Sequence, residues 1–289
     1  MWQPSFMKKA RGQMIQLKSE EQIGKMREAG LVVAAALAAT RDAARPGIST
    51  LELDTIAEDV IRSSGATPSF LGYQGFTGSI CASVNDEVVH GIPRPDKVLA
   101  EGDVLSIDCG AIVDGWHGDS AITIGVGEIT PEQQRLLDVT EASMWAGFAA
   151  ARIGGRLSDI SHGVERCVMD FEAADNHEYG IVEMYGGHGI GTEMHQDPHV
   201  LNYGKPGRGP RLVKGMALAV EPMITLGAPG TRELDDGWTV VTVDGSCAAH
   251  FEHSFALTAT GPWVLTAEDG GAARLGELGV RVSQLNSRG

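Results

Sequence analysis

Two aspartates in residues 102–119, GDVLSIDCGAIVDGWHGD, have a spacing that suits a shared metal ion. Apolar runs flank Asp114-Gly115, a dipeptide typical of a two-residue hairpin turn. With those two residues as the loop, Gly110 faces Asp119 across the hairpin. Asp108 lies two residues from Gly110, so Asp108 and Asp119 share one face as diagonal neighbours. Two carboxylates this close repel each other unless a cation or a proton lies between them.

Two other interpretations of this hairpin stay open. One of the aspartates could simply cap the end of a strand. A one-residue error in the turn would move the two carboxylates to opposite faces of the sheet. The hairpin by itself therefore does not establish a metal site.

The second half of the chain repeats the acidic pattern. Residues 215–221, GMALAVE, match residues 102–108, GDVLSID, in the glycine, the leucine three positions on, and the acid after a β-branched residue. Glu252 opens an apolar run, EHSFALT, much as Asp119 does. An acid pair in each half indicates a weak internal duplication, which would bring both pairs to one pseudo-symmetric centre. Four carboxylates converging in a core are tolerable only with cations.

His188 has the strongest claim among the nine histidines to complete such a centre. It lies among glycines, GGHGIG, between the two acid pairs. These glycines do not fit a dinucleotide-binding loop, because the third glycine of that motif and its strand–helix context are missing. Four carboxylates and one imidazole form a hard, oxygen-rich set. Such a set suits two closely spaced divalent ions that share bridging carboxylates and a water.

The remaining histidines have weaker claims. His90 and His195 come next, since each lies upstream of an acid pair. His117 and His253 directly adjoin strand acids, so they point to the other face and are expected to be structural. Nothing in the sequence supports a site role for the others, which are His162, His177, His199 and His250.

Length and charge limit the class of protein. The 289 residues fit one large domain or two closely packed halves. The net charge of −15 argues against DNA or RNA as the primary ligand, and no apolar run is long enough for a membrane span. Residues 1–16 lack the apolar core of a signal peptide. The four cysteines, Cys81, Cys109, Cys167 and Cys247, show no pairing motif, as suits a reducing cytoplasm.

Helical patterns surround the acidic motifs. Ser19 with Gln22 and Ser49 with Glu52 form capping boxes that open helices, and Pro131 suits a first helical position. We expect a mobile arm at residues 1–18, a single domain over 19–267 and a loose tail at 268–289. The expected helices cover residues 19–44, 49–65, 131–152 and 158–174, and the expected strands include 80–84 and 238–243.

Six motifs are similar to those of the type I bacterial methionine aminopeptidases, the actinobacterial members in particular. The resemblance covers roughly residues 19–266, and the motifs fall in the family's order. It implies an α+β pita-bread fold, in which two pseudo-symmetric halves form an antiparallel sheet covered by helices. The motifs are VNDEVVHGIP around His90, SIDCG at Asp108, HGDSA at Asp119, GGHGIG at His188, AVEPM at Glu221 and FEHS at Glu252.

The resemblance implies two divalent ions, which could be Co, Mn, Fe or Zn. It places Asp108 on one ion only, Asp119 and Glu252 as bridges, and His188 and Glu221 on the other ion. Two metal ions lower the pKa of a bound water toward ~7, so the water can attack a peptide carbonyl at neutral pH.

The same resemblance implies roles around the substrate. His195 would polarise the carbonyl oxygen, His90 would donate toward the peptide nitrogen, and Glu221 would move a proton from the water to the leaving amine. Met194 departs from the family, whose better-known members carry an aromatic residue there. The residues implied to line the methionine pocket are Tyr73, Phe76, Cys81, Met194 and Trp238.

The implied activity is removal of N-terminal methionine from nascent polypeptides, with a preference for small second residues, in a monomeric cytoplasmic enzyme. Xaa-Pro aminopeptidases and prolidases share the fold and ligand pattern. They usually carry an extra N-terminal domain, whereas only about a hundred residues precede Asp108 here. A non-catalytic binding module is a third reading, although such modules have typically lost metal ligands. The basic arm, residues 1–18, could also contact ribosomal RNA.

Overall fold

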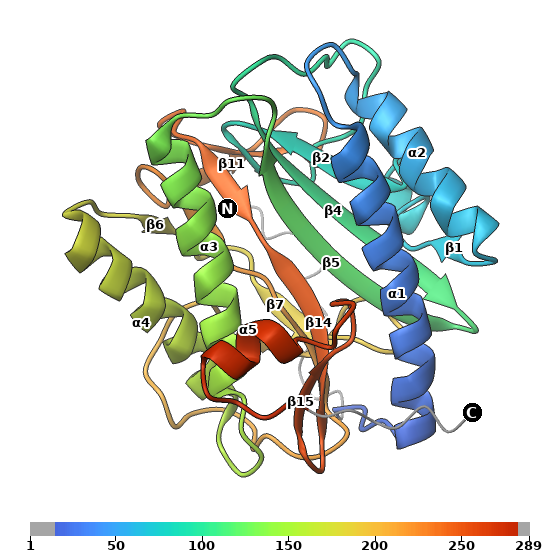
Figure 1. Cartoon of the computed structure of the whole chain (residues 1–289), viewed down its shortest axis with the longest axis vertical. Helices are drawn as coiled ribbons and strands as arrows, with labels where there is room; N and C mark the ends of the chain where they lie inside the picture. The colour runs from blue at the N-terminus through green and yellow to red at the C-terminus, as the bar shows by residue number, and fades with distance from the viewer. Residues whose placement is uncertain (1–14, 283–289) are drawn as a thin grey trace.

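The computed structural model describes residues 15–282, and its main element is one antiparallel sheet (Figure 1). The strands of this sheet are β1 Thr67–Pro68, β2 Ile80–Val84, β4 Val104–Val113, β5 Trp116–Gly125, β7 Gly187–Gly189, β8 Gln196–Val200, β9 Ala217–Val220, β14 Glu252–Thr258 and β15 Gly261–Val264. They run in the order β1-β4-β5-β14-β9-β7-β8, with β2 also paired to β4 and β15 to β14.

Two three-stranded sheets accompany the large one. In the first, β10 (Met223–Thr225) lies between β13 (Ala248–His250) and β6 (Gly180–Ile181). In the second, β12 (Val240–Thr242) lies between β11 (Thr231–Glu233) and β3 (Glu87–Val89). The strand predicted at 238–243 is thus shorter than expected. The Asp236 carboxylate accepts hydrogen bonds from the backbone N–H groups of Trp238 and Thr239, which holds both residues in the preceding turn.

The predicted helices are confirmed with bounds close to those expected. The capping boxes form at Ser19–Gln22, Ser49–Glu52 and Thr130–Gln133, each satisfying backbone donors that a helix start leaves free. The helices are α1 Glu20–Ala43, α2 Thr50–Ser63, α3 Pro131–Ala150, α4 Leu157–Asp175 and α5 Ala272–Glu277, with a short 3-10 turn, η2, at Tyr73–Gly75.

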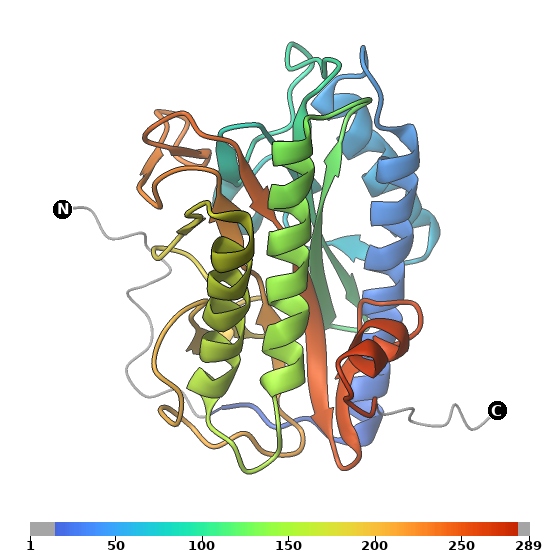
Figure 2. The same cartoon turned by 60° about the vertical axis from the view of Figure 1, so that its left-hand side comes forward.

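The helices cover the large sheet as two pairs, one over each half. Figure 1 shows α1 and α2 beside β4 and β5, and α3 and α4 on the other side of β14. Turned by 60°, Figure 2 shows the same two pairs, with the sheet strands between them. One buried core lies between α1, α2 and strands β2 and β4, and a second lies between α3, α4 and strands β9 and β14. The α+β prediction of an antiparallel sheet covered by helices is confirmed.

The central hairpin has the register that the sequence predicts. Val113 pairs with Trp116 and Gly110 with Asp119, so Asp108 and Asp119 lie diagonally on one face. The two turn residues have positive φ, 50° at Asp114 and 80° at Gly115, as a two-residue hairpin turn requires. The alternative of a shifted turn is therefore excluded.

Both ends of the described chain pack more closely than the sequence suggests. Lys18, placed in the mobile arm, is only 5 % exposed, and Leu275, placed in the loose tail, is fully buried against the second core. The remainder of both expected segments, residues 1–14 and 283–289, lies outside the described residues. No helix within residues 15–282 is both long and apolar enough to cross a membrane.

Candidate metal centre

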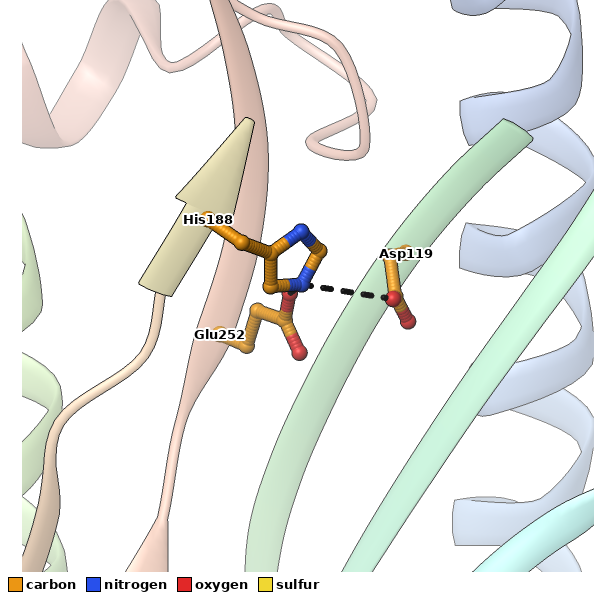
Figure 3. A group of neighbouring side chains, drawn as sticks. All are labelled: Asp119, His188 and Glu252. Carbon is orange, nitrogen blue, oxygen red and sulfur yellow. Dashed lines mark ion pairs between the residues drawn. The ribbon is translucent and has the colours of Figure 1, made fainter. Parts of the chain in front are cut away.

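The order of the strands brings all five predicted ligands to the middle of the large sheet. Asp108 lies on β4, Asp119 on β5 and Glu252 at the start of β14, while His188 lies on β7 and Glu221 directly follows β9. Because β4, β5, β14, β9 and β7 are successive neighbours, residues far apart in sequence meet at one point. Figure 3 shows Asp119, His188 and Glu252 pointing toward one another from three strands.

The His188 imidazole is the point where these side chains converge. Its Nε2 lies 3.5 Å from Glu221 Oε1, 3.9 Å from Asp119 Oδ2 and 4.0 Å from Glu252 Oε1. Its Nδ1 lies 2.9 Å from the Gly189 carbonyl oxygen. A carbonyl only accepts, so Nδ1 carries the hydrogen and the Nε2 lone pair faces the carboxylates. This is the tautomer that a metal-binding histidine needs.

The glycines around His188 let its strand lie close to its neighbours. A Cβ at Gly187 would come 2.2 Å from the Ala219 carbonyl oxygen, and one at Gly189 would come 2.3 Å from the Asp197 carbonyl oxygen. Both contacts are with backbone atoms, which cannot move aside cheaply. The glycine motif therefore serves close backbone approach, as the sequence suggests.

Burial changes the protonation of the centre in the absence of cations. It raises the pKa of Asp108 to about 7, and the Glu221 charge adds to the shift. Burial likewise raises the pKa of Glu221 to about 7. The pKa values of Asp119 and Glu252 rise well above their usual range, first through burial and then through repulsion by the neighbouring carboxylates. Burial lowers the pKa of His188 to about 4, so it is neutral at pH 7.

The unpartnered carboxylate oxygens of the centre suit divalent cations. Asp108 Oδ1, Asp119 Oδ1 and Glu252 Oε1 are buried and have no hydrogen-bond partner. Buried polar atoms normally find a partner, and three unpartnered carboxylate oxygens around one imidazole indicate that a cation satisfies them. Two groups of donor atoms lie within 4.8 Å of one another, the first from Asp119, His188 and Glu252 and the second from Glu221, His250 and Glu252. Oxygen donors with one nitrogen suit Mn, Fe, Co or Zn.

His195 and His90 lie next to this centre. The His195 ring packs edge-on against His188, with ring centroids 4.4 Å apart, and its Nδ1 lies 2.9 Å from the Tyr73 hydroxyl. Burial lowers the pKa of both His195 and His90 to about 4. The backbone of His90 has a φ of 62°, in the left-handed region that non-glycine residues seldom adopt. Such strained positions concentrate at functional sites.

The residues predicted to line a methionine pocket form one apolar cluster. Phe76 and Trp238 pack edge to face at 5.0 Å, and Cys81 pairs in register with the ligand Asp108. The Trp238 ring also lies 6.2 Å from His90. The cluster therefore adjoins the centre. Its members are Phe70, Phe76, Cys81 and Met194, with Tyr73, Ile92 and Trp238 packed against them.

Sequence reasoning missed three of the residues found here. Phe70 and Ile92 complete the apolar cluster, and no local pattern distinguishes them from ordinary core residues. His250 was given no site role, yet it is 2 % exposed and its Nε2 lies 3.5 Å from Glu221 Oε2. One signal was available, because His250 precedes Glu252 by two positions and residues two apart in extended chain share a face. By contrast, His253 bonds to Ser120 and Thr266, as a structural residue would.

Comparison with known proteins gives a family match over most of the chain. The model of metallopeptidase family M24 matches residues 24–259. Methionine aminopeptidase 1 of Mycobacterium tuberculosis is 56% identical over 249 residues, which are 86% of this chain and 94% of that protein. The crystal structure of methionine aminopeptidase from Rickettsia prowazekii superposes with a TM-score of 0.84 at 39% identity, covering 88% of this chain and 100% of that one.

A prolidase is similar in fold alone. The prolidase from Pyrococcus furiosus superposes with a TM-score of 0.69 at 19% identity and covers 87% of this chain but 65% of its own.

Proposed function

The chain belongs to metallopeptidase family M24 and has its pita-bread fold, and we propose that it removes methionine from the N-terminus of peptides and nascent proteins. The observation that carries the proposal is the convergence of Asp119, Glu221 and Glu252 on His188, with Asp108 on the same face of the hairpin as Asp119, beside an apolar cluster. The alternative of a prolidase has less support, because prolidases resemble this chain in fold only. A non-catalytic module is disfavoured, since all five ligands are present.

Two divalent ions would be held by the five ligands. Asp108 would bind one ion, His188 and Glu221 the other, and Asp119 and Glu252 would lie between them. When bound, such ions act as Lewis acids and lower the pKa of a bound water toward ~7. The ligand set accepts Fe, Mn, Co or Zn, so the metal used depends on supply.

Glu221 would move the proton in the reaction. Its carboxylate is buried at the centre, with Oε1 3.5 Å from His188 Nε2. A carboxylate held beside the attacking water can accept its proton and pass it on. In this role Glu221 takes a proton from the attacking water and passes it to the leaving amine.

His195 would donate a hydrogen bond to the carbonyl oxygen of the scissile peptide. The Tyr73 hydroxyl lies 2.9 Å from His195 Nδ1. If the hydroxyl donates to Nδ1, the hydrogen of the neutral ring stays on Nε2, where it can meet an oxygen that gains negative charge. Tyr73 thereby fixes the tautomer of a catalytic residue.

His90 would donate toward the peptide nitrogen. It packs edge-on against Tyr185 at 5.7 Å and lies near Trp238, so its ring has a fixed orientation between the apolar cluster and the centre. Burial keeps the ring neutral at pH 7 by lowering its pKa to about 4.

The apolar cluster would select the methionine side chain. Phe76, Tyr73 and Trp238 offer aromatic edges to a thioether, a contact that stabilises by about 0.3–1.5 kcal/mol. Met194 and Cys81 add a flexible and a small side chain to the same cluster. The free amino group of the substrate would face the centre, which would restrict cleavage to the first peptide bond and favour a small second residue.

The proposal also includes the compartment, the oligomeric state and a ribosome contact of the enzyme. The enzyme would act in the cytoplasm, which suits its four free cysteines. It would act as a monomer, which size-exclusion chromatography tests. The basic arm, residues 1–18, would contact ribosomal RNA near emerging chains. Ribosome co-sedimentation that is unchanged after deletion of residues 1–14 would contradict this contact.

Peptide cleavage tests the proposed function. Purified protein with added Mn²⁺ or Co²⁺ is mixed with Met-Ala-Ser, and with an Ala-Pro peptide for comparison, and released amino acids are measured by mass spectrometry. We expect free methionine from the first peptide and no cleavage of the second. Cleavage of Ala-Pro alone would identify a proline-specific enzyme, and cleavage of neither would favour a binding module.

A further inference from the structure

His250 is the one buried histidine at the centre for which the proposed mechanism has no use. It ends strand β13, whose partner strand β10 places Met223 opposite it. Its backbone is fixed by Thr123, whose hydroxyl donates to the His250 carbonyl at 2.7 Å and lies 2.8 Å from the His250 N–H. The same hydroxyl contacts Ser106 on β4. Two strands of the large sheet therefore hold His250 in place.

The ring of His250 is aimed at one carboxylate. Its Nε2 is buried, has no hydrogen-bond partner and lies 3.5 Å from Glu221 Oε2. Glu221 thus stands between two imidazoles, because its other oxygen, Oε1, lies 3.5 Å from His188 Nε2. The two histidines face opposite oxygens of the same carboxyl group.

The surroundings of the two rings differ. Within 4 Å, His188 Nε2 meets three of the carboxylates that we assign as ligands, whereas His250 Nε2 meets Glu221 alone. Glu252 lies farther from His250, although the donor atoms of Glu221, His250 and Glu252 all lie within 4.8 Å of one another. Glu221 is therefore the nearest acceptor for an N–H on His250 Nε2, because a carboxylate oxygen only accepts.

We propose that His250 is a positioning residue, whose Nε2–H donates to Glu221 Oε2 and leaves Oε1 for the metal ion. The 3.5 Å separation is longer than a hydrogen bond, and such contacts commonly tighten only when an active centre is assembled. Fixing one oxygen orients the carboxylate that carries the proton. This inference rests on the proposed function, since it takes Glu221 as both ligand and proton carrier.

Two substitutions distinguish hydrogen-bond donation by His250 from direct binding of a metal ion by His250. His250→Gln keeps an N–H donor but loses the imidazole, whereas His250→Leu loses both. We expect His250→Leu to lower kcat on Met-Ala-Ser by about 10- to 100-fold with little change in KM, and to weaken Mn²⁺ binding to the metal-free protein in calorimetry. His250→Gln should stay within about 3-fold of the wild type, since rescue by an N–H donor is what an orienting hydrogen bond allows.

His177→Leu provides the matched control. His177 lies outside the centre, packed edge to face against Tyr179 at 4.7 Å, with Nε2 facing the Leu226 carbonyl. Its replacement removes a half-buried histidine without touching the ligands, so kcat and Mn²⁺ affinity should stay at wild-type values. Wild-type kcat and affinity in His250→Leu would overturn the proposal.

Equal losses in the two His250 variants would also overturn it. If the Co²⁺ spectrum then showed one imidazole fewer, His250 would be a ligand instead. If His250→Leu fails to fold, NMR of the ring N–H of His250 in the metal-loaded wild type still tests the proposal. We expect a slowly exchanging Nε2–H resonance that is absent from His250→Gln, and its absence from the wild type would contradict the proposal. If the wild type binds Mn²⁺ without releasing methionine, the proposed function fails while the binding measurements still test His250.

Discussion

Asp108 and Glu252 enter the centre from strands that are not neighbours, and each has a buried carboxylate oxygen without a partner. If both bind metal ions, Asp108→Asn and Glu252→Gln should lower methionine release by more than about 100-fold. This exceeds the loss of about 10- to 100-fold typical of residues that contact a metal ligand but not the metal itself. Neither change should unfold the protein, because each amide replaces a carboxylate that is costly to bury. Peptide cleavage and thermal melts measure the two effects.

Asp114→Asn is the control for these variants, since Asp114 lies exposed at the turn of the same hairpin. Asparagine tolerates its left-handed backbone, so activity and melting temperature should both stay unchanged. Full activity in Asp108→Asn would remove Asp108 from the ligand set.

At the residue scale, the sequence predicts those features of the site that a local sequence pattern determines. The Asp114-Gly115 turn fixes the register of the hairpin, and the register places Asp108 and Asp119 on one face. The meeting of Glu221 with His250 depends on how the small β10–β13 sheet sits against the large one. The spacing of His250 and Glu252 indicates that both share a face, but no spacing within the chain encodes the contact between His250 and Glu221.

Two glycines let helix α1 pack closely against its neighbours, Gly30 on α1 itself and Gly118 on β5. A Cβ at Gly30 would come 2.2 Å from the Leu265 carbonyl oxygen, and a Cβ at Gly118 on β5 would come 2.7 Å from the Gly30 nitrogen. Since Asp119 follows Gly118, this close approach also sets the position of a ligand strand. Gly30→Ala should therefore destabilise the fold by about 1–3 kcal/mol through overpacking. Urea unfolding measures the change.

Gly24→Ala in the same helix is the matched control. A Cβ at Gly24 would meet nothing within 4 Å, so alanine there should stabilise the helix by about 0.5–1 kcal/mol. Opposite signs at the two positions are the expected result. A Gly30→Ala protein as stable as Gly24→Ala would mean that α1 does not approach the Leu265 backbone this closely.

At the element scale, long elements with strong local signals were predictable and short ones were not. Capping boxes and proline placed three of the helix starts, because those signals act within one turn. Strands of two or three residues, such as β6 and β13, exist only because a partner strand lies beside them. Their formation is a property of tertiary packing, which periodicity does not report.

The chain after residue 267 belongs to the packed molecule in its described part, although its composition suggests a loose tail. Leu275 on α5 is fully buried in the second core. The Arg27 guanidinium also donates to the carbonyl oxygens of Leu265 at 2.7 Å, Ala267 at 2.5 Å and Glu268 at 2.7 Å, which anchors the start of this segment. A Leu275→Ala substitution should cost about 2–5 kcal/mol of unfolding free energy.

Leu278→Ala is its control, because Leu278 is 50 % exposed just beyond the same helix. Its removal should change the unfolding free energy by less than about 0.5 kcal/mol, as usual for surface sites. Denaturant unfolding of both variants therefore tests whether the folded domain ends at residue 267, as composition predicts, or continues through α5. Equal stability of the two variants would favour the shorter domain.

Metal removal should couple the stability of the whole molecule to pH. Without cations, burial raises the pKa of Asp108 and Glu221 to about 7, against values near 4 in an unfolded chain. Asp108 and Glu221 therefore keep protons in the folded metal-free protein that the unfolded chain releases between roughly pH 4 and pH 7. The contribution of these two carboxyl groups to stability consequently falls as the pH rises through that window, whereas the buried histidines, whose pKa values are lowered to about 4, contribute in the opposite direction.

Divalent cations should abolish this dependence, since they take the place of the protons between the carboxylates. The difference in melting temperature between the Mn²⁺-loaded protein and protein dialysed free of metal should thus be small near about pH 5 and widen toward about pH 8. Asp108→Asn, which removes one of the buried charges, should reduce the loss of stability of the metal-free protein over the same range. A difference that stays constant with pH would mean that the carboxylates of the centre are not the groups that cations replace.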